Sequence, residues 1–205
     1  MFDADAVELR STFAAEVDPG LLGTPRYNLA PTQQAVVLVA DSAVAPAPLV
    51  ACRRAFGWRH PSRGGQVLIN ARAETVATRV LFRRAWRQAR CLVPVRGFFE
   101  WAAGPPPRQP VWFGRRDGRL FALAALVDGD GFVIVTHAAN EAVGPVHGRM
   151  PWALAPDHAV RFTAHDIEAP DPGNQLAAAE MTARPASRTL NSPRNDHPGV
   201  LRADS

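Results

Sequence analysis

Apolar residues alternate with short polar segments along this chain, and their spacing predicts a sheet-rich protein. Continuous apolar runs of about four to eight residues, bounded by Gly, Pro or polar residues, are typical of buried strands. Such runs predict strands at 35–40, 66–69 and around 91–94, followed by a β-meander at 111–113, 120–127 and 132–136. The Gly-Pro-Pro-Pro sequence at 104–107 predicts a turn between two strands.

Helical spacing is confined to shorter parts of the chain. Residues 5–15 predict a helix, because Asp5 can cap it and Leu9 and Phe13 fall on one face. A longer helix is predicted at 74–89, with an apolar face at Val76, Val80 and Trp86 and an exposed face of arginines at 79, 83, 84, 87 and 90. Further short helices are predicted at 140–143, 157–162 and 174–181.

Together these elements predict one α+β domain over residues 1–205, with a mostly antiparallel, barrel-like sheet core flanked by short helices. A proline-bounded loop is expected at 25–34, and residues 182–205 form a predicted irregular, proline-rich C-terminal tail. With 47% apolar and 20% charged residues among 205, the composition is that of a single globular core.

The composition also limits which cellular compartment and which cofactors we expect. The N-terminus is acidic where a secretory signal is basic, and no apolar run approaches the length of a membrane span. We therefore expect a cytoplasmic protein without a membrane partner. Cys52 and Cys91 form neither a disulfide framework nor a pair with metal-ligand spacing, so we expect no metal and no cofactor.

All 23 basic residues are arginine, and the formal net charge is +4. Because the chain has no lysine, a Schiff base with a carbonyl substrate can form only at the N-terminal amine. Arginine also favours bidentate contacts with phosphate, which makes an anionic partner such as nucleic acid plausible. A net charge of +4 is equally compatible with an ordinary solvated surface.

Three polar segments interrupt the apolar pattern and carry groups that can give or take a proton. The first contains Asn70, which follows an apolar strand and either orients a substrate or caps its own backbone at the strand end. Two residues later, Arg72 can bind phosphate or pair with Glu74.

The second segment places Glu100 between Phe99 and Trp101. Aromatic neighbours that keep water away raise the pKa of a carboxyl group, which suits a general acid or base near neutral pH. The alternative is simple strand alternation, in which both aromatic rings face the core and Glu100 faces water.

The third segment places His147 between Pro145 and Pro151, with Arg149 two residues away. Prolines restrict the backbone, and a fixed imidazole is suited to proton transfer, although a structural role is the alternative. Cys91 is a possible thiol nucleophile for a hydrolase, but its apolar strand setting favours a core position, as does that of Cys52.

Read in order, these segments resemble the SRAP family, the SOS-response-associated peptidases or abasic-site processing proteins. The resemblance rests on Arg-Tyr-Asn-Leu-Ala-Pro-Thr-Gln at 26–33, Ile-Asn-Ala-Arg-Ala-Glu-Thr at 69–75, Cys-Leu-Val-Pro at 91–94 leading to Gly-Phe-Phe-Glu-Trp at 97–101, Arg-Gln-Pro at 108–110, His-Gly-Arg-Met-Pro at 147–151 and Asn-Ser-Pro-Arg-Asn-Asp at 191–196. It runs from about Tyr27 to the C-terminal tail.

The resemblance implies a β-rich fold that binds single-stranded DNA and caps an abasic site covalently. In the family, the amine and thiol of an N-terminal cysteine react with the sugar aldehyde to give a thiazolidine, and peptidase action exposes that cysteine. Carried over by motif, Asn70 would position the terminal residue, Glu100 would transfer protons, and His147 would assist ring opening. The implied DNA contacts are Arg72, Arg149, Asn28, Trp58 and Arg63.

The resemblance further implies a monomer whose partner is single-stranded DNA with abasic sites, and which associates with the nucleoid when it is bound to DNA. The chain departs from the family at its start, because it begins Met1-Phe2 and no cysteine precedes Cys52. It also departs at Ser62 and Arg63, in the segment where the family usually has a tryptophan, and at Gly148, where the family has an acidic residue.

Two hypotheses follow from these departures. In the first, the true start lies upstream, and the family's first strand and its cysteine are missing here. In the second, the chain is a variant that binds abasic or single-stranded DNA without crosslinking it. We expect SRAP-type peptidase and lyase activity with crosslinking for the longer form. For the chain that begins at Met1 we expect weak or no stable crosslinking, with at most a reversible imine at its amine.

Overall fold

The computed structural model describes residues 1–41, 48–59, 64–167 and 171–204. Within these ranges the α-helices are α1 (Ala6–Phe13), α2 (Pro19–Leu22), α3 (Ala73–Val76), α4 (Arg83–Gln88) and α5 (Pro156–Thr163). Short 3-10 helices are η2 (Pro172–Asn174), η3 (Ala178–Glu180), η4 (Arg188–Asn191) and η5 (Pro198–Leu201). None of the described helices is long and apolar enough to cross a membrane.

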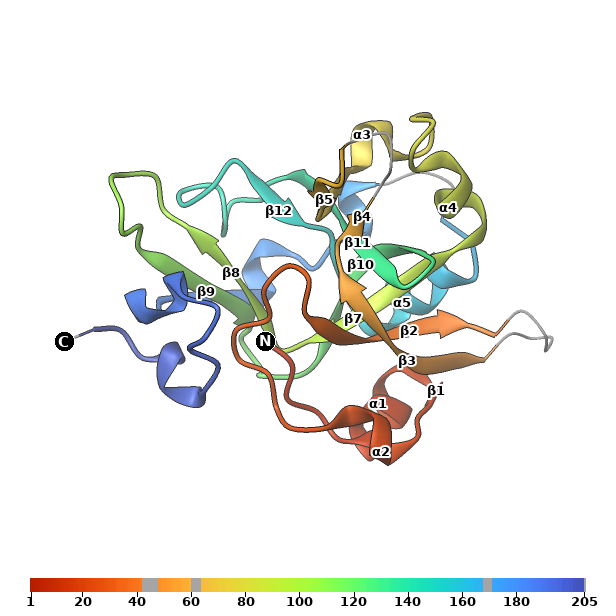
Figure 1. Ribbon diagram of the computed structural model, residues 1–205, viewed down its shortest axis with the longest axis horizontal. Coiled ribbons are helices and arrows are strands. Elements are labelled where there is room, and N and C mark those ends of the chain that lie inside the picture. The colour runs from red at the N-terminus through yellow and green to blue at the C-terminus, as the bar shows by residue number, and fades with distance from the viewer. Residues whose placement is uncertain (42–47, 60–63, 168–170, 205) are drawn as a thin grey trace.

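The strands form three sheets (Figure 1). The largest contains β1 (Ala15–Glu16), β2 (Gln34–Ala40), β3 (Leu49–Phe56), β6 (Asn70–Arg72), β7 (Arg90–Val95), β10 (Phe121–Asp128), β11 (Gly131–Ala138), β12 (Arg149–Pro151) and β13 (Ala153–Leu154). A second sheet has the order β14 (Met181–Pro185), β9 (Pro110–Arg115) and β8 (Gly97–Trp101), and the third pairs β4 (Trp58–Arg59) with β5 (Val67–Leu68).

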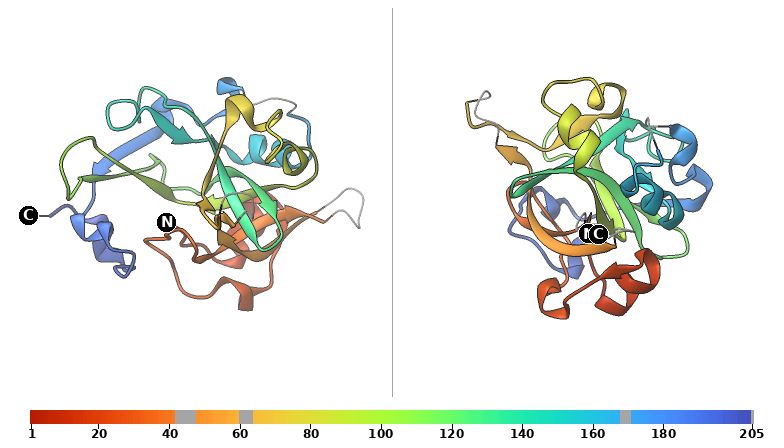
Figure 2. Two further views of the ribbon diagram at one scale, coloured as in Figure 1. Left: turned by 45° about the horizontal axis from the view of Figure 1, so that its top comes forward. Right: turned by 90° about the vertical axis from the view of Figure 1, so that its right-hand side faces the viewer.

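The main sheet closes on itself. Its strands pair in the order β3, β2, β7, β10 and β11, and β11 pairs back to β3 through Gly131–Ala55 and Phe132–Phe56. Most pairings are antiparallel, and the parallel ones join β1 to β3, β3 to β11 and β6 to β11. Figures 1 and 2 show the strands wrapping around a common centre with helices on the outside. The predicted α+β, barrel-like architecture is therefore confirmed.

Alternation along each strand supplies both faces of this sheet with apolar side chains. In β7, Leu92 belongs to the cluster that packs against α1, α4 and α5, whereas Cys91 and Val93 belong to the cluster on the other face. The second cluster includes Phe98 of β8 and Phe113 of β9. Because successive strand residues point to opposite faces, a nearly continuous apolar run is needed where both faces are covered.

The helix predicted at the N-terminus is confirmed. α1 begins after Asp5, whose carboxylate accepts a hydrogen bond from the backbone N–H of Glu8 at 2.8 Å. Its buried positions include Leu9 and Phe13, as the spacing predicts. Ahead of it, Phe2 exchanges two backbone hydrogen bonds of 2.7 Å with Arg26, which holds the first residues against the loop before β2.

The single helix predicted at 74–89 is wrong, because the structure has two short helices, α3 and α4, joined by turns. Its first half contains four β-branched residues, Thr75, Val76, Thr78 and Val80, and the side-chain rotamers of such residues are restricted in a helix. The Thr78 hydroxyl donates to the Thr75 carbonyl at 3.2 Å, a local bond that competes with helix continuation. As a result Val80, predicted on the apolar face, is 77% exposed.

Two further predicted helices are corrected. Residues 141–146 form turns, and the Asn140 side chain accepts hydrogen bonds from the backbone N–H groups of Ala142 and Val143. Such an Asx-type turn satisfies the backbone locally. The stretch 174–181 holds the last residue of η2, the 3-10 helix η3 and the first residue of β14, and no α-helix.

The C-terminal segment has more structure than its prolines predict. β14 pairs with β9 over five residue pairs, from Met181–Arg115 to Pro185–Val111. Beyond it, η4 and η5 bury Leu190 and Val200 in a small apolar cluster with Trp112. Figure 1 shows this segment beside β8 and β9, with the C-terminus at the edge of the molecule and the N-terminus near its middle.

Candidate active site

A cavity of about 450 Å³ opens where the main sheet, β8 and the C-terminal segment meet. Its apolar wall comes from the face of the main sheet, with Val93, Leu123 and Phe132 among its members. Its polar groups come from elements far apart in the sequence: Met1, Asn28, Asn70, Glu100 and Asn191. An apolar pocket with a few convergent polar groups is a typical ligand site.

The N-terminal amine of Met1 is buried at this cavity. It donates a hydrogen bond to the Gly97 carbonyl at the start of β8, at 2.8 Å, and the Met1 carbonyl accepts one from the Arg96 N–H at 3.1 Å. Burial lowers the pKa of this amine to about 5, although the carboxylate of Asp196 opposes the shift. At neutral pH the amine is therefore mostly uncharged, which is the nucleophilic form.

Glu100 projects from β8 into the same cavity. Its side chain is 20% exposed, and burial raises its pKa to about 7, with the His147 side chain acting in the opposite direction. The structure thus supports the interpretation of Glu100 as a carboxyl group shielded from water rather than a solvated strand residue. A carboxyl group with this pKa exchanges protons readily at neutral pH.

His147 lies at the rim, with Nδ1 at 3.5 Å from the Glu100 carboxylate. The same Nδ1 is 2.8 Å from the Arg149 carbonyl oxygen and 3.3 Å from the Arg149 backbone nitrogen, so the ring is held against the backbone of Arg149. The ring is half exposed. The structure therefore brings Glu100 and His147 together, as an acid–base pair requires.

Asn70 begins β6, pairs with Ile134 of β11 and is exposed at the cavity. Arg72, two residues on, pairs with Thr136 and is also exposed, with no side-chain partner among the described residues. The alternation of β6 buries Ala71 between them, so the two polar side chains share one face of the strand.

The Arg149 side chain makes its hydrogen bonds within the protein. Its guanidinium makes a bidentate pair with Glu74 at 2.9 and 3.0 Å and donates to the Thr136 carbonyl at 2.6 Å. These bonds join β12 to α3 and β11, and they fix the segment that carries His147. We therefore regard Arg149 as a residue that positions His147 rather than as a phosphate ligand.

Two other predicted DNA contacts are buried. Trp58 is 4% exposed, and its indole N–H donates to the Gly131 carbonyl at 3.0 Å. No ring face remains for a base, so Trp58 is not a stacking contact for DNA. Asn28 is 6% exposed, and its amide donates to the carbonyls of Leu190 and Ser192 at 3.2 and 3.1 Å, which secures the C-terminal wall of the cavity.

The remaining predicted positions lie outside the site. Arg63 and Ser62 fall outside the described residues. Cys91 is fully buried and its thiol pKa is strongly raised by burial, which contradicts a hydrolase built on that thiol. Cys52 does not line the cavity either. Among the described residues, no group of three or more His, Cys, Asp or Glu side chains is placed to hold a metal ion.

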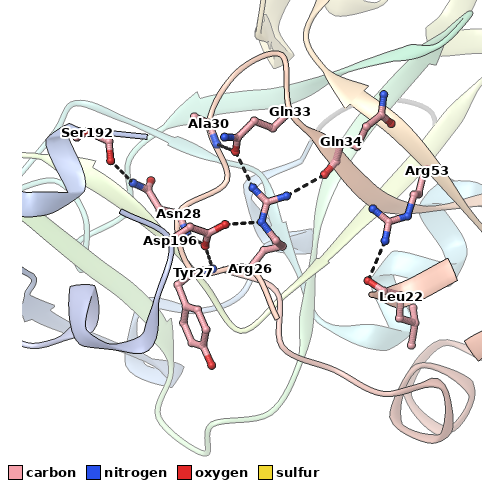
Figure 3. A network of polar contacts seen from close by, with 10 residues as sticks. All are labelled: Leu22, Arg26, Tyr27, Asn28, Ala30, Gln33, Gln34, Arg53, Ser192 and Asp196. Atoms are coloured by element: carbon pink, nitrogen blue, oxygen red, sulfur yellow. Dashed lines mark hydrogen bonds and ion pairs between the residues drawn. The ribbon is translucent and has the colours of Figure 1, made fainter. Parts of the chain in front are cut away.

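One network next to the cavity is not predicted by the sequence. The Asp196 carboxylate accepts from the side chain of Arg26 and from the backbone N–H groups of Tyr27 and Asn28, the latter two at 2.5 and 2.9 Å (Figure 3). Arg26 also donates to the side chain of Gln33 at 2.7 Å. Since the Arg26 backbone pairs with Phe2, this network ties the C-terminal segment to the residues that place Met1.

Asp196 and Arg26 are 170 positions apart in the sequence. Both stand in the segments that carry the family resemblance, which is the signal that could have drawn attention to them. Nothing in the local sequence identifies them as partners.

The fold and the cavity define a barrel-type α+β protein with a buried terminal amine, a carboxyl group and an amide on one pocket. Residues 2–193 match the sequence profile of the SRAP family, described as SOS response associated peptidase. The chain belongs to this family.

Curated relatives match over most of their length. The abasic site processing protein YoaM of Bacillus subtilis is 29% identical over 195 residues, which cover 88% of this chain and 86% of the relative. The abasic site processing protein YedK of Escherichia coli is 29% identical over 192 residues, covering 87% and 83%. A solved structure of a protein from Bacteroides thetaiotaomicron superposes with a TM-score of 0.75 at 18% identity, covering 100% of this chain and 98% of that one, and it supports the fold alone.

Proposed function

We propose that this protein processes abasic sites in single-stranded DNA, and that its first residue captures the aldehyde of the opened sugar. One observation carries the proposal: the Met1 amine, the Glu100 carboxyl group and the Asn70 amide line a single cavity. The substrate class rests on the names of the relatives, which are abasic site processing proteins. The exposed Arg72 beside Asn70 suits a phosphate next to the lesion.

The chemistry uses the protonation states that the cavity favours. The lone pair of the neutral Met1 amine attacks the aldehyde carbon, the carbonyl electron pair moves to oxygen, and a proton passes from nitrogen to that oxygen. Protonated Glu100 then gives its proton to the hydroxyl group, which leaves as water while nitrogen forms the C=N bond. The iminium proton returns to Glu100, so the sum is amine plus aldehyde to imine plus water.

The surrounding residues have supporting roles in this proposal. Asn70 orients the terminal residue and the sugar by hydrogen bonding from the edge of β6. His147, 3.5 Å from Glu100, assists opening of the sugar ring and relays protons to the carboxyl group. The self-processing peptidase activity concerns chains in which residues precede the reactive amine.

The covalent bond shields the abasic site for as long as it lasts. An imine hydrolyses readily, so the linkage formed by Met1 is reversible. A cysteine at the same position would add its thiol across the C=N bond, with the thiol proton passing to nitrogen, and would give a stable ring. A second function, binding without a covalent bond, is favoured by one observation: neither Cys52 nor Cys91 lines the cavity.

Borohydride trapping with single-stranded DNA tests the proposal. The chain that begins at Met1 is incubated with an oligonucleotide carrying one abasic site, and the mixture is quenched with borohydride, which reduces an imine to a stable amine. We expect a slow-migrating adduct with the abasic oligonucleotide and none with the intact one. A Met1→Cys variant with a free terminal amine should give a heat-stable adduct without borohydride.

Selective acetylation of the terminal amine provides the control. It removes the nucleophile and leaves the rest of the cavity in place, so the adduct should disappear while DNA binding remains. If wild-type protein binds the abasic oligonucleotide but borohydride traps nothing, non-covalent binding is the function instead. If it distinguishes abasic from intact DNA in neither assay, both functions are refuted.

A further inference from the structure

A strongly basic surface lies along α4 and the turn before it. It consists of four exposed arginines, Arg79, Arg83, Arg84 and Arg87, and we call it the arginine surface. The chain has no Asp or Glu between Thr75 and Phe99, so no acidic side chain of this segment neutralises it. A local charge of this size on a chain with net charge +4 is a marked concentration.

The packing of α4 forces these side chains outward. α4 buries Ala85 and Trp86, which leaves Arg83, Arg84 and Arg87 on its exposed sides. Among the described residues, the only side-chain hydrogen bond of the four arginines joins Arg84 Nε to the Gln88 amide oxygen at 3.4 Å. The guanidinium groups are therefore available to a ligand.

A groove of about 740 Å³ runs between this surface and the turn that joins β10 to β11. Arg79 and Arg84 stand on one side, and Asp128 and Gly129 on the other. Val80, at the edge of the groove, is 77% exposed. Two arginines facing one carboxylate leave a net positive lining, which suits a phosphate backbone.

The register along β11 gives the separation between Arg72, beside the cavity, and the groove at the arginine surface. Arg72 pairs with Thr136 near the end of β11, whereas Asp128, in the groove, pairs with Gly131 at the start of the same strand. Five residues of β-strand separate these positions, or about 17 Å at roughly 3.3 Å per residue. In a stacked strand with one phosphate per ~3.4 Å, that is about five phosphates.

We propose that the arginine surface binds the phosphate backbone of the DNA strand that carries the abasic site, about five nucleotides from the lesion on one side. The proposal rests on the proposed function for the lesion in the cavity. Arg72 contacts the strand beside the lesion, and the strand continues along α3 to the groove, where Arg79 and Arg84 take up further phosphates. DNA with short arms reaches the cavity alone, and longer DNA engages both.

Oligonucleotides of different arm lengths test this surface. Binding is measured by fluorescence anisotropy with a single abasic site carrying 3 nucleotides on each side, or 12 on one side and 3 on the other, in both polarities. The variant, called the α4 variant, replaces Arg79, Arg84 and Arg87 of the arginine surface by Gln. A matched control replaces the exposed arginines 119, 188 and 202, which lie in the loop before β10 and the C-terminal segment, by Gln.

We expect the α4 variant to lose about tenfold or more in affinity for DNA with the long arm in one polarity. It should keep its affinity for short-armed DNA within about twofold. Each lost phosphate contact lowers the salt slope of single-strand binding by about 0.7, so three lost contacts lower it by about 2. The control variant, with the same change in net charge, should reduce binding of both lengths equally and by less than about threefold.

Three outcomes would overturn the proposal: the α4 variant loses as much affinity for short DNA as for long DNA, the control variant loses as much affinity for long DNA as the α4 variant does, or the α4 variant loses no affinity. The borohydride adduct with short-armed DNA is measured in parallel and should be the same in the α4 variant and the wild type. If no adduct forms at all, the function proposed for Met1 fails. Loss of long-arm binding to intact DNA in the α4 variant would still support the arginine surface.

Discussion

Imine formation should have a bell-shaped pH dependence with its maximum near pH 6. The reaction needs the Met1 amine neutral, with a pKa of about 5, and Glu100 protonated, with a pKa of about 7. The two forms coexist between these values, because the amine loses its proton before the carboxyl group does. In an ordinary environment the order is reversed, with the carboxyl group ionised while the amine is still charged.

The two pKa values set the size of the effect. At pH 6 each group is about 90% in the reactive form, so about 80% of the protein is competent. At pH 8 only about 9% of Glu100 is protonated, and at pH 4 only about 9% of the amine is neutral, so the rate should fall about ninefold on either side.

Rapid-quench measurements give this profile directly. Saturating abasic oligonucleotide is mixed with protein at each pH, and samples are quenched with borohydride at intervals. A peptide with the sequence of the first ten residues provides the reference for an amine in water. Its rate should rise with pH up to its ordinary pKa near 8, without a fall between pH 6 and 8.

The variant Glu100→Gln separates the two limbs. It should lose the fall above pH 7, keep the fall below pH 5, and react at least about 10²-fold more slowly at pH 6 because the general acid is gone. A profile that is flat from pH 5 to pH 8 would refute the reasoning. So would a Glu100→Gln variant that retains the alkaline limb.

Three further predictions concern the supports of the site. Asp196→Ala should lower the free energy of unfolding by about 2–3 kcal/mol in urea titrations, since two backbone N–H groups and Arg26 lose a charged acceptor, and an unchanged midpoint would contradict this. The pKa of Asp196 is lowered in the folded state by its hydrogen bonds. This stabilisation is therefore present above about pH 4 and is lost as the pH falls through the folded-state pKa. Glu74→Gln should slow imine formation with little change in stability, because it loosens Arg149 and with it His147, and a wild-type rate would argue against this positioning. Trp58→Phe should lower the free energy of unfolding by about 1–3 kcal/mol in calorimetry, because it leaves a small cavity and an unpaired Gly131 carbonyl, and should leave the affinity for short DNA unchanged. A specific loss of affinity would return this ring to the DNA contacts.

The strands could be predicted because their apolar runs are long and both faces of the sheet are covered. The helix predicted at 74–89 failed because the spacing of Val76, Val80 and Trp86 imitated one continuous helix, while the β-branched residues between α3 and α4 favoured turns. The helix cap at Asp5 was predicted correctly because a cap depends on a residue only three positions away.

The site shows the same division between local and distant interactions. The aromatic neighbours of Glu100 predicted a raised pKa, and its pKa is raised by burial, but Phe99 packs with the Trp112 cluster, and the cavity that buries Glu100 forms only when distant elements meet. The pairing of Asp196 with Arg26 and the burial of the Met1 amine depend on closure of the fold across most of the sequence. Trp58 was expected to contact DNA, but it is covered where β10 turns into β11, and its indole N–H bonds to the Gly131 carbonyl there.

Mapping the borohydride-reduced adduct by mass spectrometry tests the central claim most directly. Trypsin cuts after Arg10, so Met1 lies in a terminal peptide of ten residues that contains no other amine. After nuclease digestion of the DNA, we predict that this peptide alone carries the reduced sugar, on its terminal nitrogen, and that acetylation of Met1 abolishes the modification. A terminal peptide recovered unmodified after incubation with abasic DNA, under conditions where the protein binds that DNA, would contradict the account.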